Sequence, residues 1–188
     1  MRRRTLLAAL PAAALASCAS PEPAYFTLGP VPGTPAPGGI RLIELRRPGL
    51  AGYLDRPEIV RGGANYQLRV AGQERWGEPF GDMVGRILAE NLSQRLPGSS
   101  VFTAAGAITA EANAALELDV QRFDADPSGQ VVLVAQVAVT RGRNRTASTT
   151  RTVRRTVAPA GPGTSDLVAA MSRALGQLAD EIAPLLRA

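Results

Sequence analysis

Carboxylates are the side chains through which this sequence could perform catalysis. Its 188 residues include no His and no Lys, and Cys18 is its single cysteine. Ser-His-Asp triads, imidazole metal sites and Schiff bases are therefore excluded. Glu117 and Asp119 lie at positions i and i+2 of an expected strand, which places both carboxylates on its solvent face. We interpret them as surface residues and expect that the protein is not an enzyme.

A second carboxylate motif, Asp124–Gly129 (DADPSG), begins like a calcium-binding loop. Oxygen-bearing side chains occupy its positions 1, 3 and 5, and Gly129 occupies position 6. Position 12 is Ala135, where a calcium loop needs a glutamate that binds through both oxygens. The motif therefore predicts a hairpin turn, and we expect no bound metal.

The start of the chain has the layout of a secretory signal peptide. Arg2–Arg4 are basic, and Thr5–Leu15 form an apolar stretch too short to span a bilayer. The tetrapeptide that ends at Cys18 (LASC) resembles the lipobox of bacterial lipoproteins, in which the cysteine is lipidated. The alternative is an ordinary signal peptide with an unrelated cysteine nearby.

The lipobox implies that residues 1–17 are removed as a signal peptide. Cys18 would then carry a covalent diacylglycerol and an N-acyl chain such as palmitate, and we expect no other cofactor. Residues 18–24 would form a tether of at most about 20 Å. It would hold one domain, residues 25–188, close to a membrane.

The basic composition gives little support to nucleic-acid binding. All 21 basic residues are Arg, and three of them leave with the signal peptide. The remaining 18 arginines face 16 acidic residues, a net charge of only +2. We therefore expect no nucleic-acid partner.

Hydrophobic periodicity predicts two long helices. Apolar residues from Glu78 to Leu96 follow one helical stripe with Leu88 near its middle, and we expect Arg95 to be exposed. A second stripe begins after Thr164 or Ser165 and includes Leu178. Pro184 should kink or end this helix.

Alternating apolar residues predict the strands, and a loop rich in Pro and Gly, residues 29–39, separates the first two. The expected strands are 25–28, 40–45, 58–61, 66–70, 100–103, 114–123, 130–141 and 150–157. With the two helices they predict an α+β fold of two layers. Its mixed, mainly antiparallel sheet would pack against both long amphipathic helices.

Two groups of residues are candidates for contact with partners. Leu50, Tyr53 and Leu54 lie in a segment, Gly49–Pro57, that lacks helical or strand periodicity. These apolar side chains, and Trp76 before the first helix, could pack on the core or face a partner protein. The arginines near residue 143 could bind anionic headgroups or form a solvated hairpin; those singled out are Arg141, Arg143 and Arg145.

Several of these segments resemble the PqiC family, also called ABC-type transport auxiliary lipoproteins. The resemblance rests on YFTLG after the lipobox, on the segment that contains Tyr53-Leu54-Asp55-Arg56-Pro57, and on Trp76-x-Glu78-Pro79 before a helix. It covers most of residues 18–183, although Ala51 stands where many relatives are expected to have Pro.

The resemblance implies a lipid-anchored, non-catalytic subunit on the periplasmic face of the outer membrane. Its expected partners are an MCE-domain protein and the inner-membrane subunits of an ABC-type transporter, which together move lipids and support membrane integrity. A homo-oligomeric ring is a further expectation. The alternatives are a periplasmic carrier that itself binds lipid, which needs an apolar cavity, and a structural lipoprotein of envelope assembly.

Overall fold

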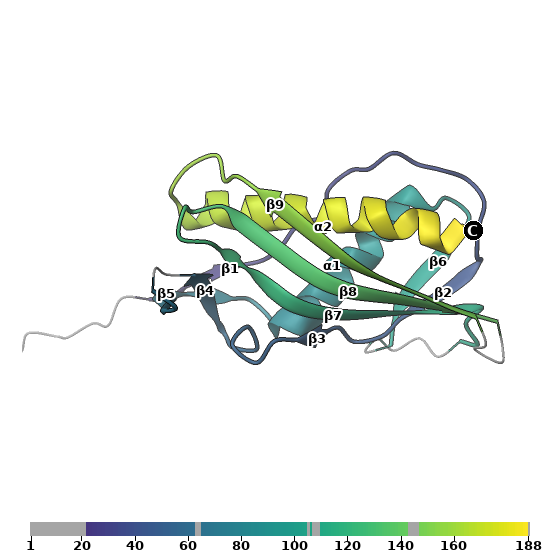
Figure 1. The fold of residues 1–188 in the computed structure, drawn as a ribbon, viewed down its shortest axis with the longest axis horizontal. Helices are drawn as coiled ribbons and strands as arrows, with labels where there is room; N and C mark the ends of the chain where they lie inside the picture. Colours follow the sequence, from purple (N-terminus) through teal and green to yellow (C-terminus); the bar gives the residue numbers. More distant parts are fainter. Residues whose placement is uncertain (1–21, 63–64, 105, 107–109, 143–146, 188) are drawn as a thin grey trace, which may run out of the picture.

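Three long antiparallel strands organise the sheet: β7 (Ala114–Ala125), β8 (Val131–Arg141) and β9 (Ala147–Val157). They belong to a computed structural model that describes residues 22–62, 65–104, 106, 110–142 and 147–187 (Figure 1). The predicted signal peptide and Cys18 lie outside the described residues, as do Arg143 and Arg145. Alternate side chains of β8 enter the core, as the sequence predicts.

The other edge of β7 is covered by three short strands that follow one another along it. β2 (Leu42–Leu45) pairs with its start, β3 (Gly49–Leu50) with its middle and β4 (Glu58–Gly62) with its end. All three are parallel to β7, so residues 42–62 act as one interrupted strand. The interruptions leave room for the segment that carries Tyr53.

The sheet is completed at both ends of this interrupted strand. β6 (Ser100–Thr103) pairs with β2, β5 (Leu68–Trp76) forms an antiparallel hairpin with β4, and β1 (Ala24–Phe26) adds to β5 in parallel. Within the described residues this makes one sheet of nine strands. The sheet is mixed, and its longest pairings are antiparallel.

Both helices pack side by side on one face of the sheet, which gives the two layers predicted from the sequence (Figure 1). α1 (Phe80–Arg95) contacts β6, and α2 (Thr164–Arg187) lies across β8 and β9. Leu88 and Leu178 are completely buried between the layers. The α+β fold class is therefore confirmed. Neither described helix has an apolar stretch long enough to cross a membrane.

The largest differences from the predicted boundaries are at the ends of β5 and α2. β5 extends to Trp76 instead of ending near Val70, because β1 pairs with its second half. α2 continues through Pro184 to Arg187. The carbonyl that Pro184 leaves without an N–H donor belongs to Asp180, whose side chain is half exposed, and Leu186 in the last turn is buried. Pro184 therefore does not end the helix.

The loop of residues 29–39, here called the strap, lies over the two helices. Gly29 N donates to Ser172 Oγ on α2 over 3.1 Å, and Val31 N donates to Asn91 Oδ1 on α1 over 2.7 Å. Further along, Ala36 N donates to the carbonyl of Arg95 over 2.9 Å. Proline and glycine exclude regular structure here, so side chains and carbonyls of the helices satisfy the backbone of the strap.

Arg95 is buried beneath the strap, so the expectation that it is exposed was wrong. Its side chain is only 2% exposed. Nη1 donates to the carbonyls of Val31 and Asn91, each over 3.0 Å, and Nε lies 2.6 Å from Asp180 Oδ1 on α2. The guanidinium thus joins both helices to the strap, a contact that appears only once the strap is in place.

Candidate partner-binding surface

The segment Gly49–Pro57 is fixed to the sheet at its start and folded into a turn. Gly49 and Leu50 form β3, and Ala51 N donates to the carbonyl of Val120 over 2.9 Å. Leu54 N then donates back to the carbonyl of Ala51 over 2.8 Å. The sequence predicted a shaped loop here and missed the two-residue strand.

Leu54 and Trp76 are both buried in the core. The Trp76 ring stacks on Phe80 at the start of α1, with ring centres 4.7 Å apart. The Trp76 backbone N–H donates to the carbonyl of Pro57 over 2.7 Å. Leu50 is partly buried against the same core. Trp76 therefore fixes the end of the segment to α1 instead of offering its ring to a partner.

Tyr53 lies between core and solvent. Its ring packs against the core and stays half-buried, and its hydroxyl donates to Asp124 Oδ2 over 3.1 Å. Arg122 Nε holds the other oxygen of this buried carboxylate at 2.8 Å. Burial, and then the negative charge of Asp124, raise the pKa of Tyr53 to about 12. Tyr53 is thus a neutral donor at any physiological pH, and part of its ring stays accessible.

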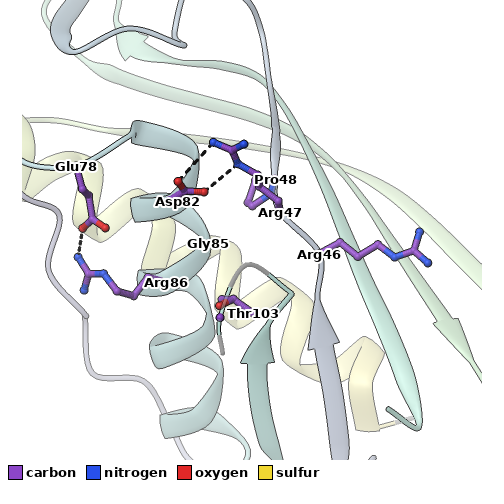
Figure 2. A pocket seen from close by; sticks show the side chains of 9 residues that line it. Arg46, Arg47, Pro48, Glu78, Asp82, Gly85, Arg86 and Thr103 are labelled. Atoms are coloured by element: carbon purple, nitrogen blue, oxygen red, sulfur yellow. Dashed lines mark hydrogen bonds and ion pairs between the residues drawn. The ribbon is translucent and has the colours of Figure 1, made fainter. Parts of the chain in front are cut away.

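An open cleft of about 260 Å³ lies beside this segment, between α1 and the chain that joins β2 to β3. Figure 2 shows arginines and carboxylates around its rim. Its lining residues are Arg46, Arg47, Pro48, Glu78, Asp82, Gly85, Arg86, Thr103 and Gly106. It lies on the exposed flank of the first half of α1.

Ion pairs bridge the rim of the cleft. Arg47 Nε lies 2.8 Å from Asp82 Oδ1, and Arg86 pairs with Glu78 (Figure 2). The hydrogen bond that Arg86 donates to Glu78 is the main cause that raises the pKa of Arg86. Arg46 pairs with Glu117 on β7 at 2.5 Å. Because these pairs are partly exposed, a partner's charged side chains can exchange with them at little cost.

A glycine on α1 allows the chain that joins β2 to β3 to approach the helix closely. A Cβ atom on Gly85 would lie only 3.1 Å from Cδ of Pro48, whereas one on Gly81 would lie 3.5 Å from Cδ1 of Leu50, an ordinary contact distance. The two glycines are four residues apart and share one helix face. The prediction of this helix considered only its apolar stripe. The glycine at position 85 is the signal that could have located the cleft.

The predicted anion-contacting arginines are only partly described. Arg141, at the end of β8, donates through Nη2 to the carbonyl of Leu185 and so ties the sheet to the last turn of α2. The structure does not bring it to the cleft or to Tyr53. Arg143 and Arg145 lie outside the described residues, and their contact with anions remains a prediction.

The carboxylate motifs have structural roles. Glu117 is paired with Arg46, and Asp119 is exposed two residues further along β7. Asp126 Oδ1 accepts the backbone N–H of Ser128 over 2.9 Å, which closes the predicted hairpin turn. The main cause that lowers the pKa of Asp126 is the hydrogen bond that its carboxylate accepts from the Ser128 hydroxyl. In the described part of the chain, no three potential metal-ligating side chains gather.

Comparison with known structures finds proteins of similar fold. An uncharacterised protein matches with a TM-score of 0.73 and 19% identity, over 88% of this chain and 99% of that one. A DUF330 protein from Xanthomonas campestris matches with a TM-score of 0.62 and 22% identity, over 85% and 90%. PelC from Paraburkholderia phytofirmans, described as a dodecamer, reaches 0.49 with 14% identity over 84% and 95%, too distant to support an argument.

A search of curated proteins finds no match. The family model for the ABC-type transport auxiliary lipoprotein component, in contrast, matches residues 26–183. That range includes the Tyr53 segment, the cleft, α1 and all of α2 except its last turn. The chain therefore belongs to the ABC-type transport auxiliary lipoprotein family.

Proposed function

We propose that this protein is a non-catalytic accessory subunit of an MCE-type lipid transport system. In this proposal Cys18 anchors it to the periplasmic face of the outer membrane, and its partners are an MCE-domain protein and inner-membrane transporter subunits. The family match over residues 26–183 carries the proposal. The lipobox before Cys18 supports the anchor, and the ion-paired carboxylates described above suit a binding role better than catalysis.

We place the contact with the MCE-domain protein at the cleft and the neighbouring Tyr53 segment. The segment follows Pro48, which lines the cleft, and the half-buried Tyr53 adds an aromatic side chain of a kind enriched at interfaces. A symmetric ring of copies would present several such surfaces to a multimeric partner.

Cys18→Ser is expected to abolish acylation and cleavage of the signal peptide. A serine has no thiol to accept the diacylglycerol, and the acyl chains contribute about 0.8 kcal/mol of membrane affinity per buried methylene. Metabolic labelling with a fatty acid, together with intact mass, measures both effects. Ser17→Ala, which keeps a small residue before the cysteine, is the control. A Cys18→Ser chain that is still processed and acylated would contradict the anchor.

Tyr53→Ala tests the partner surface. We expect it to lower recovery of the MCE-domain protein in a pull-down, because an interface aromatic is lost. Tyr53→Phe keeps the ring, removes the hydrogen bond to Asp124, and should keep binding while losing about 1 kcal/mol of stability. Thermal unfolding of each variant separates the two effects. Full binding by a folded Tyr53→Ala chain would move the interface away from this segment.

The alternative of a lipid carrier makes a different demand on the molecule. A carrier needs an apolar cavity, whereas the cleft in Figure 2 is open and rimmed by ion pairs. Native mass spectrometry of the purified protein distinguishes the two functions. Stoichiometric phospholipid bound within the domain would favour the carrier.

A further inference from the structure

The free end of the β4–β5 hairpin exposes apolar side chains. Leu68 is 49% exposed and Val70 41% exposed, and Tyr66 before them is fully exposed. Leu68 and Val70 alternate along β5 and therefore point to the same face. We call Tyr66, Leu68 and Val70 the hairpin patch. They are three of the four large hydrophobic residues exposed in the described part of the chain; the fourth, Tyr25, is on β1.

The N-terminal strand leads toward the hairpin patch. β1 is parallel to β5, and Ala24 lies opposite Glu74. β1 therefore enters from the end of β5 where Leu68 and Val70 lie. In Figure 1, β1, β4 and β5 lie together at the end of the molecule remote from the C-terminus.

The length of the tether limits how far the anchor can be from this patch. Ala24 is six positions after Cys18, and Glu74 is six positions after Leu68. Whatever path the tether takes, it spans at most about 20 Å, the length of the same number of strand residues. A tether that continues in the direction of β1 would bring Cys18, and the membrane that holds it, beside the free end of the hairpin.

The chemistry of the hairpin suits a lipid surface. Between Gly62 and Gln73 the sequence contains Arg69, which is exposed, and no acidic residue. A tyrosine, two aliphatic side chains and one cation match the interfacial layer of a bilayer, where aromatic rings sit at headgroup level and cations meet phosphates.

We propose that the hairpin patch inserts into the headgroup layer of the membrane that carries the anchor. The inference rests on the proposed anchor at Cys18. Together, the lipid chains and the patch form two attachment points and fix how the domain is oriented on the bilayer. The hairpin side then faces the lipid, and the C-terminal end of α2 lies away from it.

A single fluorescent label can test this on the lipidated chain in vesicles of phosphatidylethanolamine and phosphatidylglycerol. Lipidation consumes the Cys18 thiol, so Leu68→Cys introduces one free thiol for an environment-sensitive dye. We expect a blue shift of its emission on vesicles and loss of fluorescence with lipids brominated near the headgroup. Val70→Cys should behave alike. Both side chains are exposed, so both variants should fold.

Ser148→Cys is the matched control, because Ser148 is exposed on β9 opposite Thr140. It lies about 30 Å along the sheet from the start of β8, which adjoins the hairpin end. Its label should keep the emission seen in water. If the Leu68→Cys label emits at the same wavelength as this control on vesicles, the proposal is overturned. A label protected from aqueous iodide but not quenched by brominated lipid also overturns it, since a protein would then cover the patch. Labelling of the wild-type chain through a free Cys18 thiol would instead overturn the anchor itself, and the inference with it.

Discussion

Leu178→Ala is expected to lower the free energy of unfolding by about 2–5 kcal/mol, and Leu88→Ala by a similar amount. Both side chains are completely buried between the helices and the sheet, so truncation leaves a cavity that the packed layers cannot close. Denaturant titration followed by circular dichroism measures the change.

Gln177→Ala is the matched control for Leu178, because Gln177 is the preceding residue of α2 and is exposed. We expect it to change stability by no more than about 0.5 kcal/mol. Equal unfolding midpoints for Leu178→Ala and the wild-type chain would contradict the placement of this helix face.

Arg95→Ala is expected to cost about 2–4 kcal/mol. The substitution removes the two hydrogen bonds to the carbonyls of Val31 and Asn91 and the stem that fills the space under the strap. Asp180 is half exposed, so water can solvate its carboxylate once Arg95 is removed. The loss of stability is therefore smaller than for an ion pair in which both charges are buried. Thermal unfolding measures the loss.

Two further variants separate the parts of this contact. Arg95→Met keeps most of the stem and should recover part of the lost stability. Asp180→Ala removes only the exposed partner and should cost less than about 1 kcal/mol. A fully stable Arg95→Ala chain would mean that the strap is held by its backbone contacts alone.

Elements with strict periodicity were the ones that the sequence predicted well. The stripe through Leu88 gave α1 to within two residues at its N-terminal end and one at its C-terminal end, and alternation in β7 and β8 gave the antiparallel pair. Strands that owe their existence to a distant partner were missed or shortened. β3 has two residues and no pattern of its own, and the second half of β5 is a strand because β1 pairs with it.

Arg95 shows why a charged residue on a helix stripe needs closer reading. It lies seven positions after Leu88 and three after Leu92, which is on the buried side of α1. Its charge suggested exposure, yet the strap and Asp180 supply partners from segments far away in the sequence. Side-chain spacing was the better guide here. For the site, the sequence identified Tyr53 and its segment but not the cleft, where Pro48 closely approaches Gly85.

The interrupted strand along β7 dictates an order of folding. Ile43 in β2 pairs with Ala114, 71 positions later in the sequence, and Leu50 in β3 pairs with Val120. A chain that emerges N-terminus first therefore has no partner for β2 until β6 has appeared, and none for β3 until β7 has appeared. The hairpin of β7 and β8 closes through a short turn and can form early. The second half of the molecule becomes the template on which the first half folds, and folding should be slow for a domain of this size because its pairings span such long loops.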